Sequence, residues 1–454
     1  MNGLDIMTFG PAATVWLITV TVGVLVLHAD PATSSAPEPA PAPPAKPISV
    51  SDVPGTLLTW EDCVRLTTAN SPALQSSREA VLNSDAVRMG AYSSLYPQIS
   101  ANFTDTRTYT GAGLYAPRNY STSYLEQLSV SQMVFNGFAT KGNIDQARAQ
   151  LNLAFANLDG EKATTSYNLK MAFAQLVYAQ KLITLSRNVI DIRQKAARLV
   201  RLLYEGGSED KGAMLLEQAE LDQAVYNFNQ AERGLDLSGL QLMEIIGKDL
   251  PEPLVAEGEL KTNPLTARPD FKQLAVRTPL YFQQQADVAA AAAGITIADS
   301  GWYPTITANA ALERTDVQFP LRNHGWSAGF AVTYPIFQGG ETYFNVKAGG
   351  AALRESLQNL RSGTNESVTT LAENFKGLVD AQDNVRVQDE LLDATAMRYK
   401  IAEENYRNGL MSFEDFDTIT GNYVTQQQTC LSAELSAVLA EAAWEEARGL
   451  GAIP

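Results

Sequence analysis

The stretch YPTITAN, residues 303–309, alternates apolar and polar residues in the manner of a half-buried β-strand. A near copy, YPQISAN, occupies residues 96–102 in a chain whose other long patterns are helical. In both copies a proline follows the tyrosine, and proline disfavours the helical conformation of the residue before it. We therefore expect a helix to end and a strand to begin at each Tyr-Pro pair, as in a duplicated chain.

Further motifs recur along the chain and support this duplication. The two halves are offset by 207 residues up to the first strand signal and by 202 after the second, so the loop between the strands differs in length. Matched at 202 are VFNGF (134–138) with IFQGG (336–340), FAQLVYAQ (173–180) with FKGLVDAQ (375–382), and YEGG (204–207) with YRNG (406–409). The expected helix–strand junction residues are Tyr96, Pro97, Gly137, Tyr303, Pro304, Pro335, Gly339 and Gly340.

Each half is expected to run helix, strand, loop, strand, very long helix, tight break and helix. In the first half we expect helices at about 60–95, 138–204 and from the break at 206–207 to 246, with strands at 97–107 and 123–135. In the second half we expect helices at about 279–302, 341–406 and from the break at 408–409 to 448, with strands at 304–314 and 326–337. The predicted fold class is mainly α with β, with two β-hairpins in each chain.

The domain boundaries follow from these repeats and from composition. They are a signal peptide at 1–29, a Pro/Ala-rich linker at 30–55, repeats at 56–246 and 278–450, a linker at 247–277 and a tail at 451–454. The apolar run at 12–27 is short for a membrane span, which needs ~20 residues, and suits a secretory signal. Because no Lys or Arg precedes the run, an uncleaved anchor and a misassigned start codon remain alternatives.

The two longest predicted helices carry a seven-residue repeat. Its members are Leu169, Leu176, Ile183, Ile190, Ala197 and Tyr204 in the first half, and Leu371, Leu378, Val385, Leu392, Tyr399 and Tyr406 in the second. This period is typical of coiled-coil packing. Helices of ~66 residues would extend about 100 Å, so each needs partner helices along its length.

Composition argues against several classes of function. The formal charge is −16 and the pI about 4.7, and Lys and Arg are not clustered, so we expect no nucleic-acid binding. Two histidines, His28 and His324, and two cysteines, Cys63 and Cys430, are too few and too scattered for a zinc site or a Cys-His nucleophile. We expect no enzyme activity and no cofactor, two buried free thiols, and a solvated His324 in the loop 315–325.

The strand signals are amphipathic. One face carries Trp326, Ala328, Phe330, Val332, Tyr334 and Ile336 in the last strand, Ile306, Ala308, Ala310 and Leu312 in the strand before it, and Leu128, Val130 and Val134 in the first half. Glu126 and Gln132 interrupt this face. Such strands suit a position between lipid and a wet lumen, and equally a position on a soluble core.

The helices that flank each hairpin decide between these positions. They leave no nearby core to cover the apolar face, so lipid or other chains are expected to cover it. Four strands are fewer than the ~8 that close a barrel, and open strand edges are not tolerated in lipid. A membrane location therefore predicts an oligomer.

Taken together, the duplication, the Tyr-Pro junctions, PIFQGG (335–340) and the turns YEGG and YRNG resemble the outer-membrane efflux protein family, the TolC-like channel-tunnels, over about residues 56 to 450. The resemblance implies a homotrimer with a shared barrel of twelve strands in the outer-membrane lipid and a coiled-coil tunnel in the periplasm. It implies a passive exit duct of a tripartite efflux or type I secretion system. The implied partners are a periplasmic adaptor (membrane fusion) protein and an inner-membrane pump of the RND, ABC or MFS type.

The resemblance also implies an equatorial region and a gate. The segment 247–277 and the chain ends would form the equatorial region. Acidic residues would line a constriction where the turns meet, and the candidates are Glu414, Asp415 and Asp417, with Tyr204, Gly207, Tyr406 and Gly409 setting the turn geometry. A local alternative is that Asp415 forms a capping box with Ser412.

Two other functions are compatible with long helices and two hairpins. One is a secreted or surface coiled-coil structural protein or adhesin, in which the hairpins would be oligomer contacts. The other is a periplasmic adaptor, although an adaptor would need one helical hairpin and a lipoyl-like region where this chain has two hairpins and little else.

Overall fold

The computed structural model describes residues 57–111, 119–247, 254–264 and 267–454. Every described residue belongs to one compact unit. The expected signal peptide and the whole of the Pro/Ala-rich linker lie outside the described residues, as do residues 248–253 and 265–266 of the 247–277 segment.

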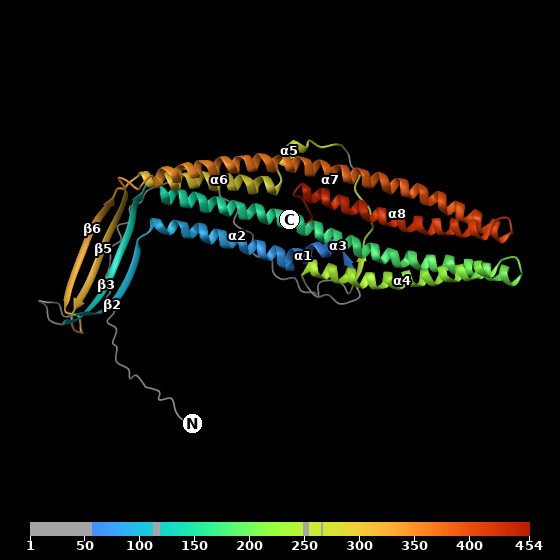
Figure 1. Cartoon of the computed structure of the whole chain (residues 1–454), viewed down its shortest axis with the longest axis horizontal. Coiled ribbons are helices and arrows are strands. Elements are labelled where there is room, and N and C mark those ends of the chain that lie inside the picture. The colour runs from blue at the N-terminus through green and yellow to red at the C-terminus, as the bar shows by residue number, and fades with distance from the viewer. Residues whose placement is uncertain (1–56, 112–118, 248–253, 265–266) are drawn as a thin grey trace, which may run out of the picture. The chain divides into compact units, whose positions relative to one another are not determined.

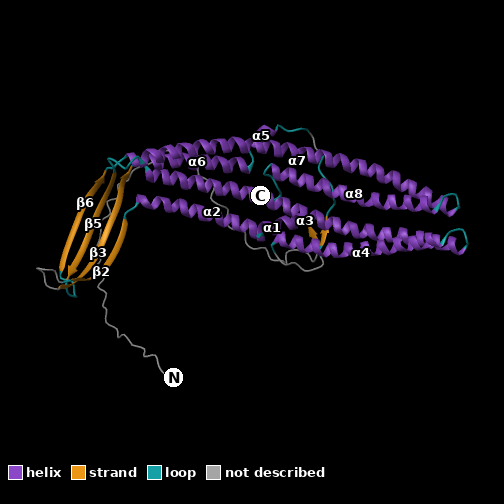
Figure 2. Cartoon of the chain, viewed as in Figure 1, coloured by secondary structure: helices purple, strands orange, loops and turns teal. Residues whose placement is uncertain are grey.

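The described elements follow the predicted order twice (Figures 1 and 2). The first half consists of β1 (Leu57–Thr59), α1 (Trp60–Asn70), α2 (Pro72–Ala91), β2 (Gln98–Thr110), β3 (Asn119–Asn136), α3 (Ala139–Glu205) and α4 (Lys211–Ile246). After β4 (Val255–Glu257) and α5 (Phe271–Ala275), the second half consists of α6 (Pro279–Asp299), β5 (Thr305–Asp316), β6 (Asn323–Thr333), α7 (Glu341–Arg407) and α8 (Phe413–Ala447). The predicted duplication is therefore confirmed in the structure.

The single helix expected at 60–95 is wrong, because the chain leaves the helical conformation at Ser71 (ψ 122°). Pro72 then begins α2 as its first residue, a position where its missing N–H costs no helical hydrogen bond. Proline also disfavours the helical conformation of the preceding Ser71. The last predicted turn is a short 3-10 helix, Tyr92–Leu95.

The four long strands form one antiparallel sheet in the order β2-β3-β5-β6 (Figure 2). The first hairpin is longer than predicted at the end that carries the connecting loop, with β2 reaching Thr110 and β3 beginning at Asn119. The last strand is shifted from the predicted 326–337 and runs Asn323–Thr333, and Pro335 beyond its end has no amide hydrogen to donate to a neighbouring strand. His324 lies in β6 opposite Arg314, which corrects its expected place in a loop.

The register confirms the predicted faces of the sheet. Leu128, Leu312 and Trp326 are cross-strand neighbours on the apolar face, and Ser100 and Ser129 share a 2.8 Å hydrogen bond on the polar face. A β-bulge at Val134, between Met133 and Phe135, shifts the end of β3 out of the simple alternation.

Both residues that interrupt the predicted apolar face have local explanations. Glu126 lies between Phe103 and Arg314 in the register, so a basic side chain occupies the neighbouring position. The Gln132 side-chain amide turns back along the chain and donates to the carbonyl oxygen of Leu95 at 3.3 Å, at the end of the 3-10 helix.

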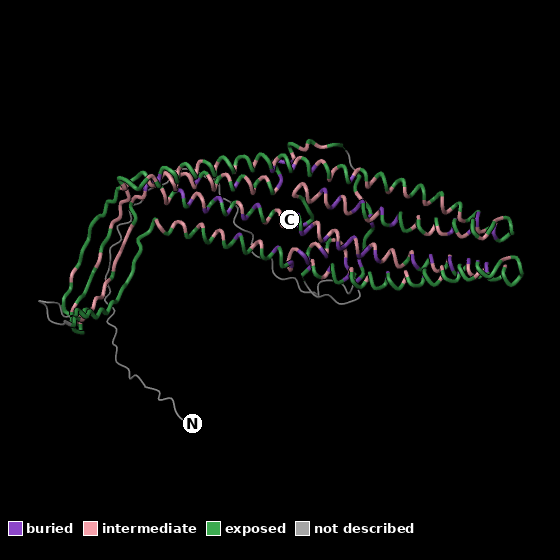
Figure 3. Tube along the Cα trace, in the orientation of Figure 1, coloured by how far each residue is buried: buried purple, intermediate pink, exposed green. Residues whose placement is uncertain are grey.

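The helices pack in a series that matches the strand order. α2 contacts α3, α3 contacts α6, and α6 contacts α7, while α4 packs against the second part of α3 and α8 against α7 and α3 (Figure 1). Buried residues concentrate on the helix faces that meet, whereas exposed positions dominate the two outer strands, β2 and β6 (Figure 3). The buried core thus lies between the helices.

The members of the predicted seven-residue repeat are buried or partly buried in both long helices, with the exception of Tyr204 at the end of α3. Leu371, Leu378 and Tyr406 of α7 are buried, and the members between them are partly buried. In α3 the members Leu169 and Leu176 are buried, and Ile183, Ile190 and Ala197 are partly buried. The buried positions after Leu176 are Val177, Ala179, Ser186, Val189, Arg193, Ala196 and Val200. A different set of α3 residues is buried at strict seven-residue steps, namely Thr165, Ala172, Ala179, Ser186, Arg193 and Val200. The buried face of α3 is therefore centred on a different heptad position from the predicted one.

The middle of α3 is covered by short segments from distant parts of the sequence. β1 and β4 pair in parallel, and Leu58, Leu254 and Leu260 join Leu169 and Leu176 of α3 in one buried cluster. At the other end of the chain, the Ile453 amide donates to Ser166 Oγ at 3.1 Å. No helix in the described ranges is both long and apolar enough to cross a membrane.

Candidate functional site

The two helix–strand junctions at the Tyr-Pro pairs are nearly identical. Tyr96 and Tyr303 have φ, ψ of −110°, 153° and −108°, 153°, and each amide donates to a serine carbonyl three residues earlier, at 3.1 and 3.0 Å. Pro97 and Pro304 follow, and the strands begin at the next residue. The predicted change from helix to strand thus occurs at the same place in both repeats.

The opposite junctions, from strand to long helix, use two consecutive left-handed residues. In the first half these are Gly137 (φ 63°) and Phe138 (φ 70°), and in the second Gly339 (φ 64°) and Gly340 (φ 87°). A left-handed conformation is strained for a bulky residue, which makes Phe138 unusual. The predicted junction glycines Gly137, Gly339 and Gly340 therefore adopt the left-handed conformation that joins each strand to its long helix.

The turns at the far ends of α3 and α7 have the same geometry. The Gly207 amide donates to the Tyr204 carbonyl oxygen and the Gly409 amide to that of Tyr406, both at 3.0 Å. Both glycines are left-handed (φ 75° and 71°), and the next residue donates to the carbonyl five residues before it. Each turn is a Schellman-type helix end, for which glycine is the preferred residue.

The three predicted gate carboxylates have different surroundings. Ser412 Oγ donates to an oxygen of Asp415 at 2.7 Å and accepts from the Asp415 amide at 3.1 Å, so Asp415 belongs to a capping box while remaining exposed. Glu414 is exposed beside it. Asp417 differs from the expectation of a carboxylate facing a passage, because it is partly buried and pairs with Arg193 of α3 at 2.9 Å.

The two turn tyrosines have different exposures, although they are equivalent in the repeat. Tyr406 is 1% exposed, stacks on Phe416 with ring centroids 4.6 Å apart, and donates its hydroxyl hydrogen to Glu209 at 3.1 Å. Tyr204 is 37% exposed. The Tyr406 hydroxyl therefore links the end of α7 to the turn that follows α3.

A buried ionic cluster that the sequence did not reveal lies near these turns. Arg193 contacts Glu217 at 3.5 Å and Glu220 at 3.1 Å, both on α4, in addition to Asp417 of α8. The side chain of Glu217 is completely buried, and burial raises its pKa to about 7, although Arg193 opposes this shift. The only sequence signal is the position of Arg193 seven residues from other buried positions of α3, at a heptad position other than the predicted one.

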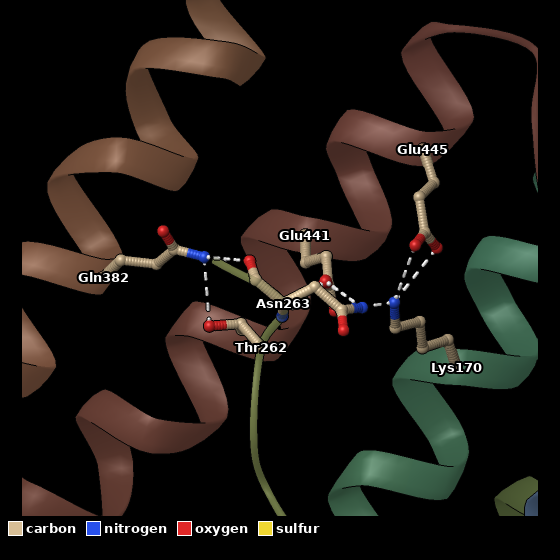
Figure 4. A network of polar contacts seen from close by, with 6 residues as sticks. All are labelled: Lys170, Thr262, Asn263, Gln382, Glu441 and Glu445. Atoms are coloured by element: carbon tan, nitrogen blue, oxygen red, sulfur yellow. Dashed lines mark hydrogen bonds and ion pairs between the residues drawn. The ribbon is translucent and has the colours of Figure 1, made fainter. Parts of the chain in front are cut away.

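A second polar cluster holds the segment 254–264 against the helices (Figure 4). Glu441 of α8 accepts hydrogen bonds from the backbone and side-chain amides of Asn263, at 3.0 and 3.1 Å. Lys170 of α3 donates to Glu441 at 2.9 Å and to Glu445 at 3.0 Å. Gln382 of α7 donates to the Asn263 carbonyl oxygen at 2.9 Å, so one short segment connects three long helices.

The cysteines agree with prediction, because Cys63 and Cys430 are both free and buried. Burial raises the pKa of each thiol to about 12, and Cys430 lies 3.1 Å from an oxygen of Asp389. Within the described residues there is no group of three or more His, Cys, Asp or Glu side chains placed to hold a metal ion.

The duplicated hairpins, the exposed apolar face of the sheet and the glycine-capped turns at the ends of long paired helices are the features expected of a channel protein with a membrane sheet and a helical stem. The model of the outer membrane efflux protein family matches residues 64–248 and 272–450, and the chain belongs to this family. It is thus an outer-membrane protein of the efflux-channel class, whose stem extends into the periplasm.

Individual relatives are distant in sequence and close in fold. The outer membrane efflux protein BepC of Brucella suis is 22% identical over 294 residues, which cover 64% of this chain and 62% of BepC. The probable efflux pump outer membrane protein TtgC of Pseudomonas putida is 22% identical over 82% of this chain and 80% of TtgC. The MtrE outer membrane channel of Neisseria gonorrhoeae, solved in an open state, has a TM-score of 0.75 at 17% identity and covers 87% of this chain and 89% of its own.

Proposed function

We propose that three copies of the chain assemble into one channel, with their sheets closed into a barrel in the outer membrane and their helices forming the duct below it. The observation that carries this proposal is the sheet itself, in which β2 and β6 each pair on one side only among the described strands. Unpaired strand edges are unstable in lipid, and three four-stranded sheets supply enough strands to close a barrel, for which ~8 are needed.

The exposed face of the sheet supports a lipid environment. Trp326 and Phe330 are each 77% exposed, and Ile99, Phe103, Leu312 and Val332 on the same face are more than half exposed. A contiguous apolar face of this size on a soluble protein would favour association or insertion. Hydrocarbon is the environment in which this face is most stable.

The proposed channel is a passive duct that works with an inner-membrane pump and a periplasmic adaptor. The sequence contains no phosphate-binding loop, so the energy for export would come from the pump. TtgC is named as the outer membrane protein of an efflux pump, which favours tripartite efflux over type I secretion. The acidic turns would be the closed end of the duct, with Glu414 and Asp415 of each copy at the constriction.

The assembly can be tested on full-length protein extracted from the outer-membrane fraction. We expect detergent, but not salt, to extract it, and we expect an SDS-resistant trimer that becomes a monomer after boiling. Crosslinking before extraction should give dimer and trimer bands and nothing larger. A stable monomer in detergent, or extraction by salt alone, would contradict the proposal and favour a surface coiled-coil protein.

A further inference from the structure

The contact between α3 and α6 joins the two repeats within one chain, and it leaves no space for a side chain at Gly142. A Cβ atom at Gly142 would lie 2.7 Å from Ile297 Cγ1 and 3.3 Å from the Ala293 carbonyl oxygen. Buried small residues continue along α3 at seven-residue steps from Gly142, namely Ala149, Ala156 and Ala163. Small residues on one helix and a large residue on the other thus allow close packing.

In the duplicated chain, α7 is the equivalent of α3 and α2 is the equivalent of α6. The positions of α7 and α2 that correspond to this contact are exposed in the single chain. The residues 202 positions after the four small residues of α3 are Phe344, Ala351, Gln358 and Asn365 of α7, and all are exposed. The residues 207 positions before Ala293 and Ile297 are Ala86 and Gly90 of α2, and both are exposed. α2 and α7 also end the helix series, as β2 and β6 end the sheet.

The large and the small residue are exchanged between the two sets of positions. Where the chain packs Gly142 against Ile297, the uncovered helices carry Phe344 and Gly90. Phe344 is 62% exposed, and a Cβ atom at Gly90 would meet no atom of the described chain within 4 Å. We propose that α7 of one copy packs against α2 of the next, with the Phe344 ring seated over Gly90. This inference rests on the proposed trimer and adds the residues that hold its subunits together.

The glycine junctions support the same contact independently. Gly137 is buried, and a Cβ atom on it would lie 2.6 Å from the Ser300 carbonyl oxygen and 2.8 Å from Tyr303 Cβ. Its equivalent, Gly339, is exposed, and a Cβ atom there would meet nothing within 4 Å among the described residues. The proposed neighbour would bring the next copy's equivalent of Tyr303, which is Tyr96, against Gly339.

Exposed aromatic rings at this junction fit the same arrangement. Within the chain, Phe135 meets Tyr303 edge to face, with ring centroids 6.5 Å apart. The equivalent residues, Phe337 and Tyr96, are 86% and 66% exposed. Packing of these two rings between copies would remove from water the most exposed aromatic side chains at the junction.

The exchanged sizes of these residues also favour one pairing of helices between copies over the other possible pairings. If α2 of another copy packed on α3, Gly90 would face Gly142 and a cavity would remain. If α7 of another copy packed on α6, Phe344 would meet Ile297 and overfill the contact. Only α7 against α2 gives one large and one small residue, so the chains can close a ring in one order.

The test is a size exchange at the subunit contact, measured as the temperature at which the detergent-solubilised trimer dissociates. Gly90→Ile should clash with Phe344, and Phe344→Gly should leave a cavity, so each alone should lower this temperature by several degrees. Gly90→Ile combined with Phe344→Gly recreates the pair found within the chain and should recover most of the loss. Gly90→Ala, a smaller change, serves as the matched control for altered helix propensity.

Other outcomes separate the possible failures. If the dissociation temperature of the double variant falls by as much as the two single variants' decreases added together, Phe344 and Gly90 are not in contact. The proposed trimer is unaffected by that result. If Gly90→Ile leaves the trimer intact but abolishes export, the face binds another protein and the proposal is overturned. If the unmodified protein forms no trimer, the proposed function fails as well.

A second experiment covers the case in which Gly90→Ile does not fold. In a chain without its own thiols (Cys63→Ala, Cys430→Ala), Gly90→Cys with Phe344→Cys should form a disulfide between copies on oxidation. Gly90→Cys with Ala348→Cys, one helical turn away, should not.

Discussion

Glu217 shows how a single carboxyl group can depend on its surroundings in this stem. Its side chain is fully buried between α3, α4 and α8, and one of its oxygens has no hydrogen-bond partner among the described residues. Burial disfavours the charged form more strongly than Arg193 favours it, so the pKa rises to about 7. Near neutral pH this carboxyl is therefore partly protonated.

This pKa predicts how stability changes with pH. The folded protein holds the Glu217 proton up to about pH 7, whereas the unfolded chain releases it near the ordinary value of 4.5, so stability falls as pH rises through this window. We expect Glu217→Gln to remove this fall, and the stability of the variant relative to the unmodified protein should rise by about 2 kcal/mol from pH 5 to pH 7. Chemical unfolding of the full-length protein at several pH values measures the difference.

A matched control separates this effect from a general loss of negative charge. Glu232 lies on the same helix, α4, and is exposed. Glu232→Gln should shift stability by the same small amount at every pH. Parallel pH profiles for Glu217→Gln and the unmodified protein would show that the pKa of the Glu217 carboxyl is not raised in the folded protein, and would refute the assignment.

At the scale of elements, the segment 254–264 acts as a strap that holds long helices in place. Its contacts are concentrated on Asn263, which reaches α8 through Glu441 and α7 through Gln382 (Figure 4). Lys170 extends the cluster to α3. Lateral contacts between helices keep long helices together, and these hydrogen bonds are such contacts between α3, α7 and α8.

The strap predicts a difference between two neighbouring glutamates. Glu441 and Glu445 both pair with Lys170, but only Glu441 also accepts hydrogen bonds from Asn263. Glu441→Ala should release the strap at a cost of about 1–3 kcal/mol, and trypsin should cleave after Lys261 roughly tenfold faster or more. Glu445→Ala removes one partner of Lys170 but keeps the hydrogen bonds between Glu441 and Asn263, so trypsin should cleave this variant at nearly the rate of the unmodified protein. Equal cleavage in both variants would show that Glu441 does not hold the segment.

The elements differ in how far the sequence determines them. Local chemistry fixed the Tyr-Pro junctions, the glycine turns and the long helices, because proline, glycine and a repeated apolar period act on nearby residues. The break at Ser71 does not follow from the sequence despite Pro72, because a proline in the first turn of a helix and a proline within a helix look alike in a continuous apolar pattern. The clusters of Arg193 and Glu441 join residues more than 200 positions apart, and no local pattern specifies such partners.

At the scale of the whole molecule, the two turns bring negative charge to one end of the stem. Ala196, Val200, Tyr406 and Phe416 share one buried cluster, so the ends of both helical hairpins lie together. Glu414 and Asp415 remain exposed there, whereas Asp417 is paired with Arg193. In a trimer these exposed carboxylates would recur around one axis, where like charges close together attract cations and hold them.

The resulting prediction is that this end sets ion selectivity. Glu414→Gln with Asp415→Asn keeps the size of both side chains, and asparagine keeps an acceptor for the cap at Ser412. For the trimer in planar bilayers we expect the double variant to lose cation selectivity and to resist block by multivalent cations, because the ring of charge is gone. Asp417→Asn should instead weaken the Arg193 cluster and lower stability while selectivity persists. Unchanged conductance, selectivity and block in the double variant would place the constriction elsewhere in the duct.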